Sequence, residues 1–113
     1  MKEIKAIIRP FKLDDVITAL HKIDGLPGLT ISGIKGFGKS KAINSKDAVK
    51  EGLHNYVKKI KIEIVVSNNM VEEIINVLQK NAHTGNPGDG KIFIINVEDV
   101  IKIRTNERGN NAI

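Results

Sequence analysis

The chain has 113 residues, a formal net charge of +5 and no cysteine. This length suits a single domain, residues 1–113, with a modest core that oligomerisation would extend. The lack of cysteine excludes a disulfide framework, a thiolate metal site and a cysteine nucleophile. The N-terminal residues lack the apolar run of a signal peptide, and no run approaches the roughly 20 apolar residues that span a bilayer. We therefore expect a cytoplasmic protein that does not insert into membranes.

The excess of lysine and arginine predicts an anionic partner or simply a soluble surface. Nucleic acid, nucleotide phosphate and an acidic protein surface would each suit this charge. Aromatic residues make up only 4% of the chain, which is thin for the stacking platforms of single-strand binders. A basic nucleic-acid-binding module is therefore the less favoured alternative.

The first half of the chain predicts a strand, a helix and a second strand. Residues 4–9 are β-branched and partly alternating, and Pro10 ends them. Apolar residues then recur at helical spacing over 13–23, behind two aspartates that suit a helix N-terminus. A glycine- and proline-containing segment ends this helix, and residues 29–34 alternate as a second strand.

The second half predicts the same elements and one short addition. Residues 60–66 predict a third strand, and a second helix follows over 71–82, with Asn69 and Glu72 forming a capping box at its start. A glycine-rich loop separates this helix from a fourth strand over 92–97. Residues 100–104 alternate and predict a short fifth strand.

The resulting order, β-α-β-β-α-β, predicts an α+β fold of the ferredoxin-like type. Residues 4–20 align without gaps on residues 62–78, which favours two similar halves with both helices on one face of the sheet. Any two amphipathic strand–helix units share some of this pattern, so the alternative is coincidence.

A connection of about twenty residues, over 36–57, joins the second and third strands, and connections this long are usually functional or disordered. Val49, Leu53 and Val57 are spaced four apart, so residues 46–57 have the alternative reading of a short amphipathic helix, weakened by Gly52. We expect a mobile arm that orders as a helix on a partner.

The sequence contains no recognisable catalytic constellation. His21, His54 and His83 have no zinc-type spacing, and no nucleophile motif is present. The acidic pairs at the helix starts are explained by the helix dipole. We therefore predict a protein that is not an enzyme and that holds no metal through its side chains.

Phosphate binding is better supported, because four glycine-rich or cationic elements occur in a short chain. Glycine lets backbone N–H groups converge on an anion, and lysine adds charge. Each element alone has an ordinary reading as a turn or a solvated strand edge. The elements are residues 36–39, Lys58 with Lys59, residues 88–91, and Lys102 with Arg104.

Several segments together point to one family. They are residues 5–16, 35–38, 61–66, 103–105 and 112–113. The most specific is 84–93, TGNPGDGKIF, which fits a signature of Ser or Thr, three residues and then Gly-Asp-Gly-Lys-Ile-Phe. Through these segments the chain resembles the PII nitrogen-regulatory signal-transduction proteins over nearly its whole length, with an atypical T-loop.

The resemblance implies a homotrimer of ferredoxin-like subunits with ATP or ADP, the ATP with Mg²⁺, in each intersubunit cleft. The T-loop would cover about 37–57 and the B-loop about 83–91. Lys102 and Arg104 would reach phosphates from the neighbouring subunit, while Thr30 and Val65 would line the base. The implied nucleotide-binding residues are Thr30, Gly36, Gly38, Lys39, Ser40, Val65, Gly88, Asp89, Gly90, Lys91, Lys102 and Arg104.

The resemblance also implies two regulatory features. The residues for 2-oxoglutarate would be Gly38, Ser40 and Lys59, but Ser40 replaces a glutamine whose amide helps to hold Mg²⁺ and the 2-oxoacid, so this ligand stays an open alternative. Glu63 and Lys91 would form a switch pair when no γ-phosphate competes for the lysine. Gly52 occupies the position of the tyrosine that enteric members have uridylylated, so that modification is excluded there.

The function implied is that of a non-catalytic regulator, with slow ATP hydrolysis at most. It would sense ATP and ADP and control a target protein through the T-loop. The target would be an ammonium transporter or an enzyme of nitrogen metabolism. The altered loop leaves open a different transporter, such as a metal-efflux pump.

Overall fold

The computed structural model describes residues 1–37, 48–52 and 54–113. Four strands form one antiparallel sheet in the order β2-β4-β1-β5, and β3 pairs with the far end of β4. This order confirms the ferredoxin-like α+β prediction. The elements are β1 (Lys2–Ile8), α1 (Leu13–His21), β2 (Leu29–Gly36), β3 (Ala48–Glu51), β4 (His54–Val66), α2 (Val71–Ala82) and β5 (Lys91–Asn96), with short 3₁₀ turns at Pro10–Lys12, Asn68–Met70 and Gly109–Ala112.

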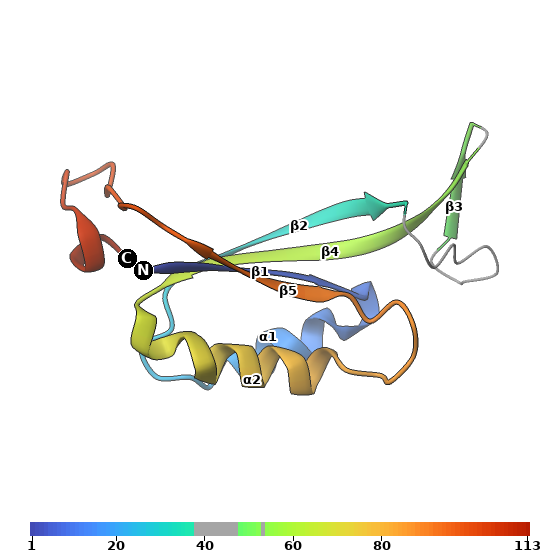
Figure 1. Cartoon of the computed structure of the whole chain (residues 1–113), viewed down its shortest axis with the longest axis horizontal. Coiled ribbons are helices and arrows are strands. Elements are labelled where there is room, and N and C mark those ends of the chain that lie inside the picture. The colour runs from blue at the N-terminus through green and yellow to red at the C-terminus, as the bar shows by residue number, and fades with distance from the viewer. Residues whose placement is uncertain (38–47, 53) are drawn as a thin grey trace.

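Both helices lie against one face of the sheet, and the other face is open (Figure 1). Alternate residues of the two central strands point into the core, because side chains of a strand alternate between its faces. Ile4 and Ile64 face each other across β1 and β4, and both are fully buried. Val16 and Leu20 of α1, and Ile74 and Leu78 of α2, complete this core.

The two halves of the chain are structurally equivalent, as the gapless alignment predicts. In each half a strand runs into a 3₁₀ turn and then directly into a helix: β1, Pro10–Lys12 and α1, and then β4, Asn68–Met70 and α2. The predicted capping box at Asn69 is wrong, because this 3₁₀ turn precedes α2. The Met70 N–H bonds to the Ser67 carbonyl at 3.0 Å, so Asn69 lies inside the turn rather than at the cap.

The alternative reading of residues 46–57 as a helix does not hold for the part that the structure describes. Residues 48–51 form β3, and β4 begins at His54, well before the predicted start at residue 60. Gly52 connects them with a φ of 59°, in the left-handed region that glycine favours and that interrupts an α-helix. Backbone pairing along the extended β4 replaces the helical turns.

The predicted fifth strand over 100–104 does not form. The segment turns back on itself, with a single bridge between Ile101 and Arg108. The N–H of Lys102 bonds to the Glu107 carbonyl at 2.9 Å, which closes a hairpin and leaves the segment unpaired with the sheet. Among the described residues, no helix is long and apolar enough to cross a membrane.

Candidate nucleotide-phosphate site

The B-loop between α2 and β5 is organised around the carboxylate of Asp89. Its Oδ1 accepts a hydrogen bond from Arg9 Nε at 3.0 Å, and its Oδ2 accepts from the backbone N–H groups of Thr84 at 2.8 Å and Gly85 at 2.9 Å. The Thr84 hydroxyl also donates to Oδ1. The carboxylate thus closes the loop from inside.

These contacts determine the protonation state of Asp89. Partial burial of the carboxylate raises its pKa, but the hydrogen bonds from Thr84, Gly85 and Arg9 outweigh that effect. The pKa of Asp89 is therefore held well below its usual range, since hydrogen bonds to the charged form stabilise it. The carboxyl group of Asp89 is therefore ionised at neutral pH.

Two cationic side chains tie the loop to the sheet. Arg9, which follows β1, also donates from its guanidinium to the Pro87 carbonyl at 2.7 Å. Lys59 of β4 donates to the Gly88 carbonyl. Lys59, which the resemblance links to a 2-oxoacid, is therefore engaged with the B-loop in this structure.

The loop glycines have backbone conformations that other residues rarely adopt. Gly88 has a φ of 101° and Gly90 a φ of 98°. A Cβ at Gly90 would lie 1.7 Å from the carbonyl oxygen of Ile7, so only glycine fits between the loop and β1. Such glycine conformations let successive N–H groups point to one side, which is the geometry of an anion-binding nest.

A second feature lies at the other end of the open sheet face. Thr30 of β2 is the register partner of Glu63 of β4, and with Val65 they line a hollow of about 290 Å³. Lys59 at the B-loop and Glu63 at this hollow are four residues apart on β4, or about 13 Å at strand spacing. The predicted base-side and phosphate-side residues therefore occupy the two ends of one surface.

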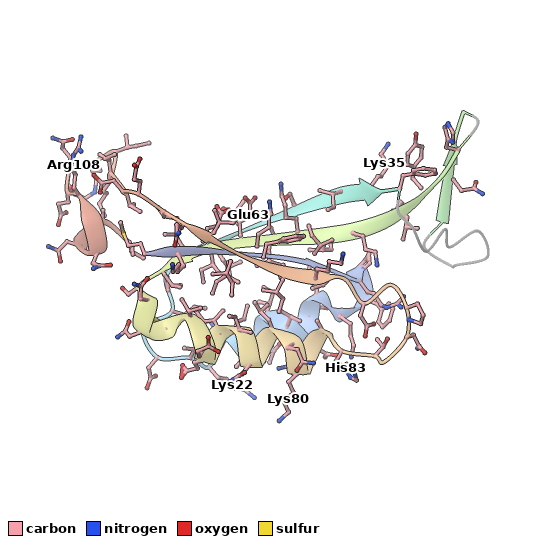
Figure 2. The ribbon with its side chains drawn as sticks, in the orientation of Figure 1. Lys22, Lys35, Glu63, Lys80, His83 and Arg108 are labelled. Carbon is pink, nitrogen blue, oxygen red and sulfur yellow. The ribbon has the colours of Figure 1, made fainter. Side chains whose placement is uncertain are left out.

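The predicted switch pair does not form in this structure. Glu63 instead forms an ion pair with Lys61, with Nζ and Oε1 3.5 Å apart. It lies on the open face of β4 (Figure 2), and β1 separates β4 from the strand that carries Lys91. The register places Lys91 opposite Ile7 rather than beside Glu63.

The structure does not bring Lys102 and Arg104 to the B-loop of the same chain. They lie in the C-terminal segment, at the opposite end of the sheet from the loop that joins α2 to β5 (Figure 1). Lys102 is 3.9 Å from Glu107 in an exposed ion pair. Gly36 ends β2, whereas Gly38, Lys39 and Ser40 lie outside the described residues.

Sequence reasoning missed Arg9 and Thr84 as site residues. Thr84 lies within the recognised motif, but nothing in its spacing shows that it bonds to Asp89. Arg9 is far from the loop in sequence, and only the sheet order brings the end of β1 to the start of β5. The signal available in the sequence was an arginine at the end of the first predicted strand, directly before Pro10.

The fold and the loop together define a class: a small ferredoxin-like protein with a glycine-rich loop that its own hydrogen bonds hold closed. Among the described residues there is no cluster of His, Asp and Glu able to hold a metal. The family model described as "Nitrogen regulatory protein P-II" matches residues 1–107. The P-II protein of Azospirillum brasilense is 47% identical over the full length of both chains, and that of Rhodospirillum rubrum is 48% identical over the same span. The chain belongs to the P-II family of nitrogen regulatory proteins, and it is a signal-transduction regulator.

A solved structure shows the same fold. The crystal structure of Arabidopsis thaliana PII bound to citrate superposes with a TM-score of 0.79 at 42% identity. The match covers 99% of this chain and 91% of that one. The prediction of family membership, and of a ferredoxin-like signalling protein that acts in nitrogen regulation, is confirmed.

Proposed function

We propose that this regulator senses adenine nucleotides, in a homotrimer whose nucleotide site is shared by two subunits. The observation that carries the proposal is the separation of the two halves of the site. The B-loop is held closed by Asp89, while Lys102 and Arg104 lie at the other end of the same chain. A second copy is needed to bring these cations to the phosphates.

The exposed apolar surface supports an oligomer. Phe93 is 44% exposed on the open face of β5, and Ile103 is fully exposed at the tip of the C-terminal hairpin. A sheet face without a covering layer and exposed apolar side chains of this kind are typical of interfaces. Ile95 and Ile101, each at least 40% exposed, extend the same surface.

In the proposed complex, ATP or ADP lies along the open face. Its phosphates would meet the backbone N–H groups of residues 88–90 and the ammonium of Lys91, and its base would enter the hollow beside Thr30 and Val65. Mg²⁺ would arrive with ATP, because Mg²⁺ is usually bound through substrate phosphates and few carboxylates. The citrate bound by the Arabidopsis protein, itself a polyanion, is in keeping with an anionic ligand.

Signalling would run from the phosphates to the arm over residues 37–57, which would contact a cytoplasmic or membrane-embedded target of nitrogen metabolism. Lys59 links the two regions, because it lies on β4 between the arm and the B-loop and binds the Gly88 carbonyl. A ligand that competes for Lys59, a γ-phosphate or a 2-oxoacid, would alter both regions together.

Subunit mixing tests the shared site. Lys91→Ala removes a cation from the B-loop side, and Arg104→Ala removes one from the C-terminal side, so each variant alone should bind ATP at least tenfold more weakly than the wild type. Mixed trimers should regain about one intact site in four by random assortment of subunits. The measurement is ATP titration by calorimetry before and after mixing by denaturation and refolding.

The control is each variant denatured and refolded by itself, which should regain no binding. Tight sites that appear only in the mixture support a site built from two chains. If the mixture binds no better than its parents, the two cations belong to one subunit or to no common site, and the proposed arrangement is wrong.

A further inference from the structure

The C-terminal residues 99–109 form a hairpin that is closed by its own hydrogen bonds. Within it, the Asn106 N–H bonds to the Lys102 carbonyl at 2.8 Å, and the Gly109 N–H bonds to the Val100 carbonyl at 3.0 Å. The hairpin carries Lys102 and Arg104, the two cations of the proposed shared site. Its geometry therefore decides where those charges are presented.

Asp99 closes the base of this hairpin with three interactions. Its Oδ1 accepts from the backbone N–H groups of Val100 at 2.8 Å and Gly109 at 3.1 Å. Its Oδ2 is 3.1 Å from the Arg108 guanidinium. One carboxylate thus joins the first and last residues of the turn-back, and Arg108 lies at this end of the molecule (Figure 2).

We infer that Asp99 is a positioning residue for nucleotide binding, acting on the neighbouring subunit's site through Lys102 and Arg104. This inference rests on the proposed function. Asp99 has no contact with the B-loop and does not itself line the hollow, although Val100, whose N–H it accepts, does. Its effect on the phosphates would therefore come from fixing the hairpin before the nucleotide arrives. Preorganisation of this kind lowers the ordering cost that binding must overcome.

The backbone hydrogen bonds of Asp99 stabilise the hairpin more than its ion pair with Arg108 does. Asp99 is 39% and Arg108 66% exposed, and exposed ion pairs contribute little. Bonds from N–H groups to a carboxylate are stronger than neutral ones. Here the bond from Gly109, whose N–H is shared with the Val100 carbonyl, joins the two ends of the hairpin, while the bond from the adjacent Val100 is local to Asp99. An isolated two-stranded hairpin is marginal in water, and Ile103 at the tip buries nothing to support it.

The test compares Asp99→Ala with Glu98→Ala. Both variants remove one negative charge at neighbouring positions, so both raise the long-range attraction for an anion equally, but Glu98 is exposed and bonded to nothing that the structure describes. Calorimetry should show ATP binding to Asp99→Ala about tenfold more weakly than to Glu98→Ala, the effect of one charge-assisted hydrogen bond. The loss should shrink from ATP to ADP and vanish for adenosine.

The dependence of the affinity loss on the number of phosphates in the ligand separates a positioning role of Asp99 from general damage to the protein. Equal ATP affinities in the two variants, or a loss as large for adenosine as for ATP, would overturn the role of Asp99. Wild-type protein that binds no adenine nucleotide would overturn the proposed function itself, and the inference with it. If light scattering shows that Asp99→Ala no longer assembles, the ATP affinity of Asp99→Asn is compared with that of Glu98→Ala in its place. The amide oxygen of Asp99→Asn still accepts from the backbone, and only the charge is lost.

Discussion

Gly90→Ala should produce the largest loss of stability and of nucleotide binding from a single added methyl group. The new Cβ would meet the Ile7 carbonyl at 1.7 Å, and the φ of 98° is one that alanine rarely adopts. Overpacking and backbone strain together should destabilise the protein by about 3–5 kcal/mol. Urea unfolding at fixed protein concentration measures this, and ATP titration of the surviving folded protein should show no binding.

The matched control is Gly33→Ala in β2, where a Cβ would meet nothing within 4 Å and φ is not positive. Its free energy of unfolding should change by less than about 0.5 kcal/mol. If Gly90→Ala were as stable as the control and bound ATP normally, the close contact between the B-loop and β1 would be wrong.

Asp89→Ala should be the next most damaging change, because it removes the carboxylate around which the B-loop is organised. The N–H groups of Thr84 and Gly85 and the guanidinium of Arg9 would lose their partner. We expect a loss of about 2–4 kcal/mol. Asp24→Ala, at an exposed carboxylate with no contact that the structure describes, should change stability by less than about 0.5 kcal/mol.

The pH dependence of this loss follows from the lowered pKa of Asp89. A carboxyl group whose pKa is lower in the folded state stabilises the protein above its unfolded pKa, about 4 for aspartate, and loses that contribution as the pH falls through the folded value. The stability difference between wild type and Asp89→Ala should therefore be constant from about pH 7 to pH 5 and should shrink below about pH 4. A difference that does not change down to the acid-unfolding region would contradict the charged, hydrogen-bonded state of Asp89.

The regular part of the fold was predictable from local patterns. Alternation in residues 60–64 and helical spacing in 71–82 determine which face is buried, and the structure buries those faces. The 3₁₀ turns and the extension of β4 to His54 were not predictable in this way, because each depends on backbone pairing that local patterns do not encode. The spacing of the apolar residues in 46–57 is compatible with a helix and with a strand. The pairing of β3 with β4 selects the strand.

The candidate site was predictable where a motif carried it. The glycines of the B-loop and Lys91 could be recognised from sequence, because their chemistry is local. The role of Arg9 could not, because it depends on β1 and β5 being neighbours. Glu63 and Lys91 are not paired within this chain for the same reason, since residues that share a face can still be separated by an intervening strand.

In the proposed function, the B-loop binds adenine nucleotide in an assembly of this chain. Isothermal titration of wild-type protein with ATP and with ADP, at a mass determined by light scattering, tests it most directly. We expect both nucleotides to bind competitively, one per subunit, to a particle of three chains. A monomer, or the absence of heat with either nucleotide at millimolar concentration, would contradict it.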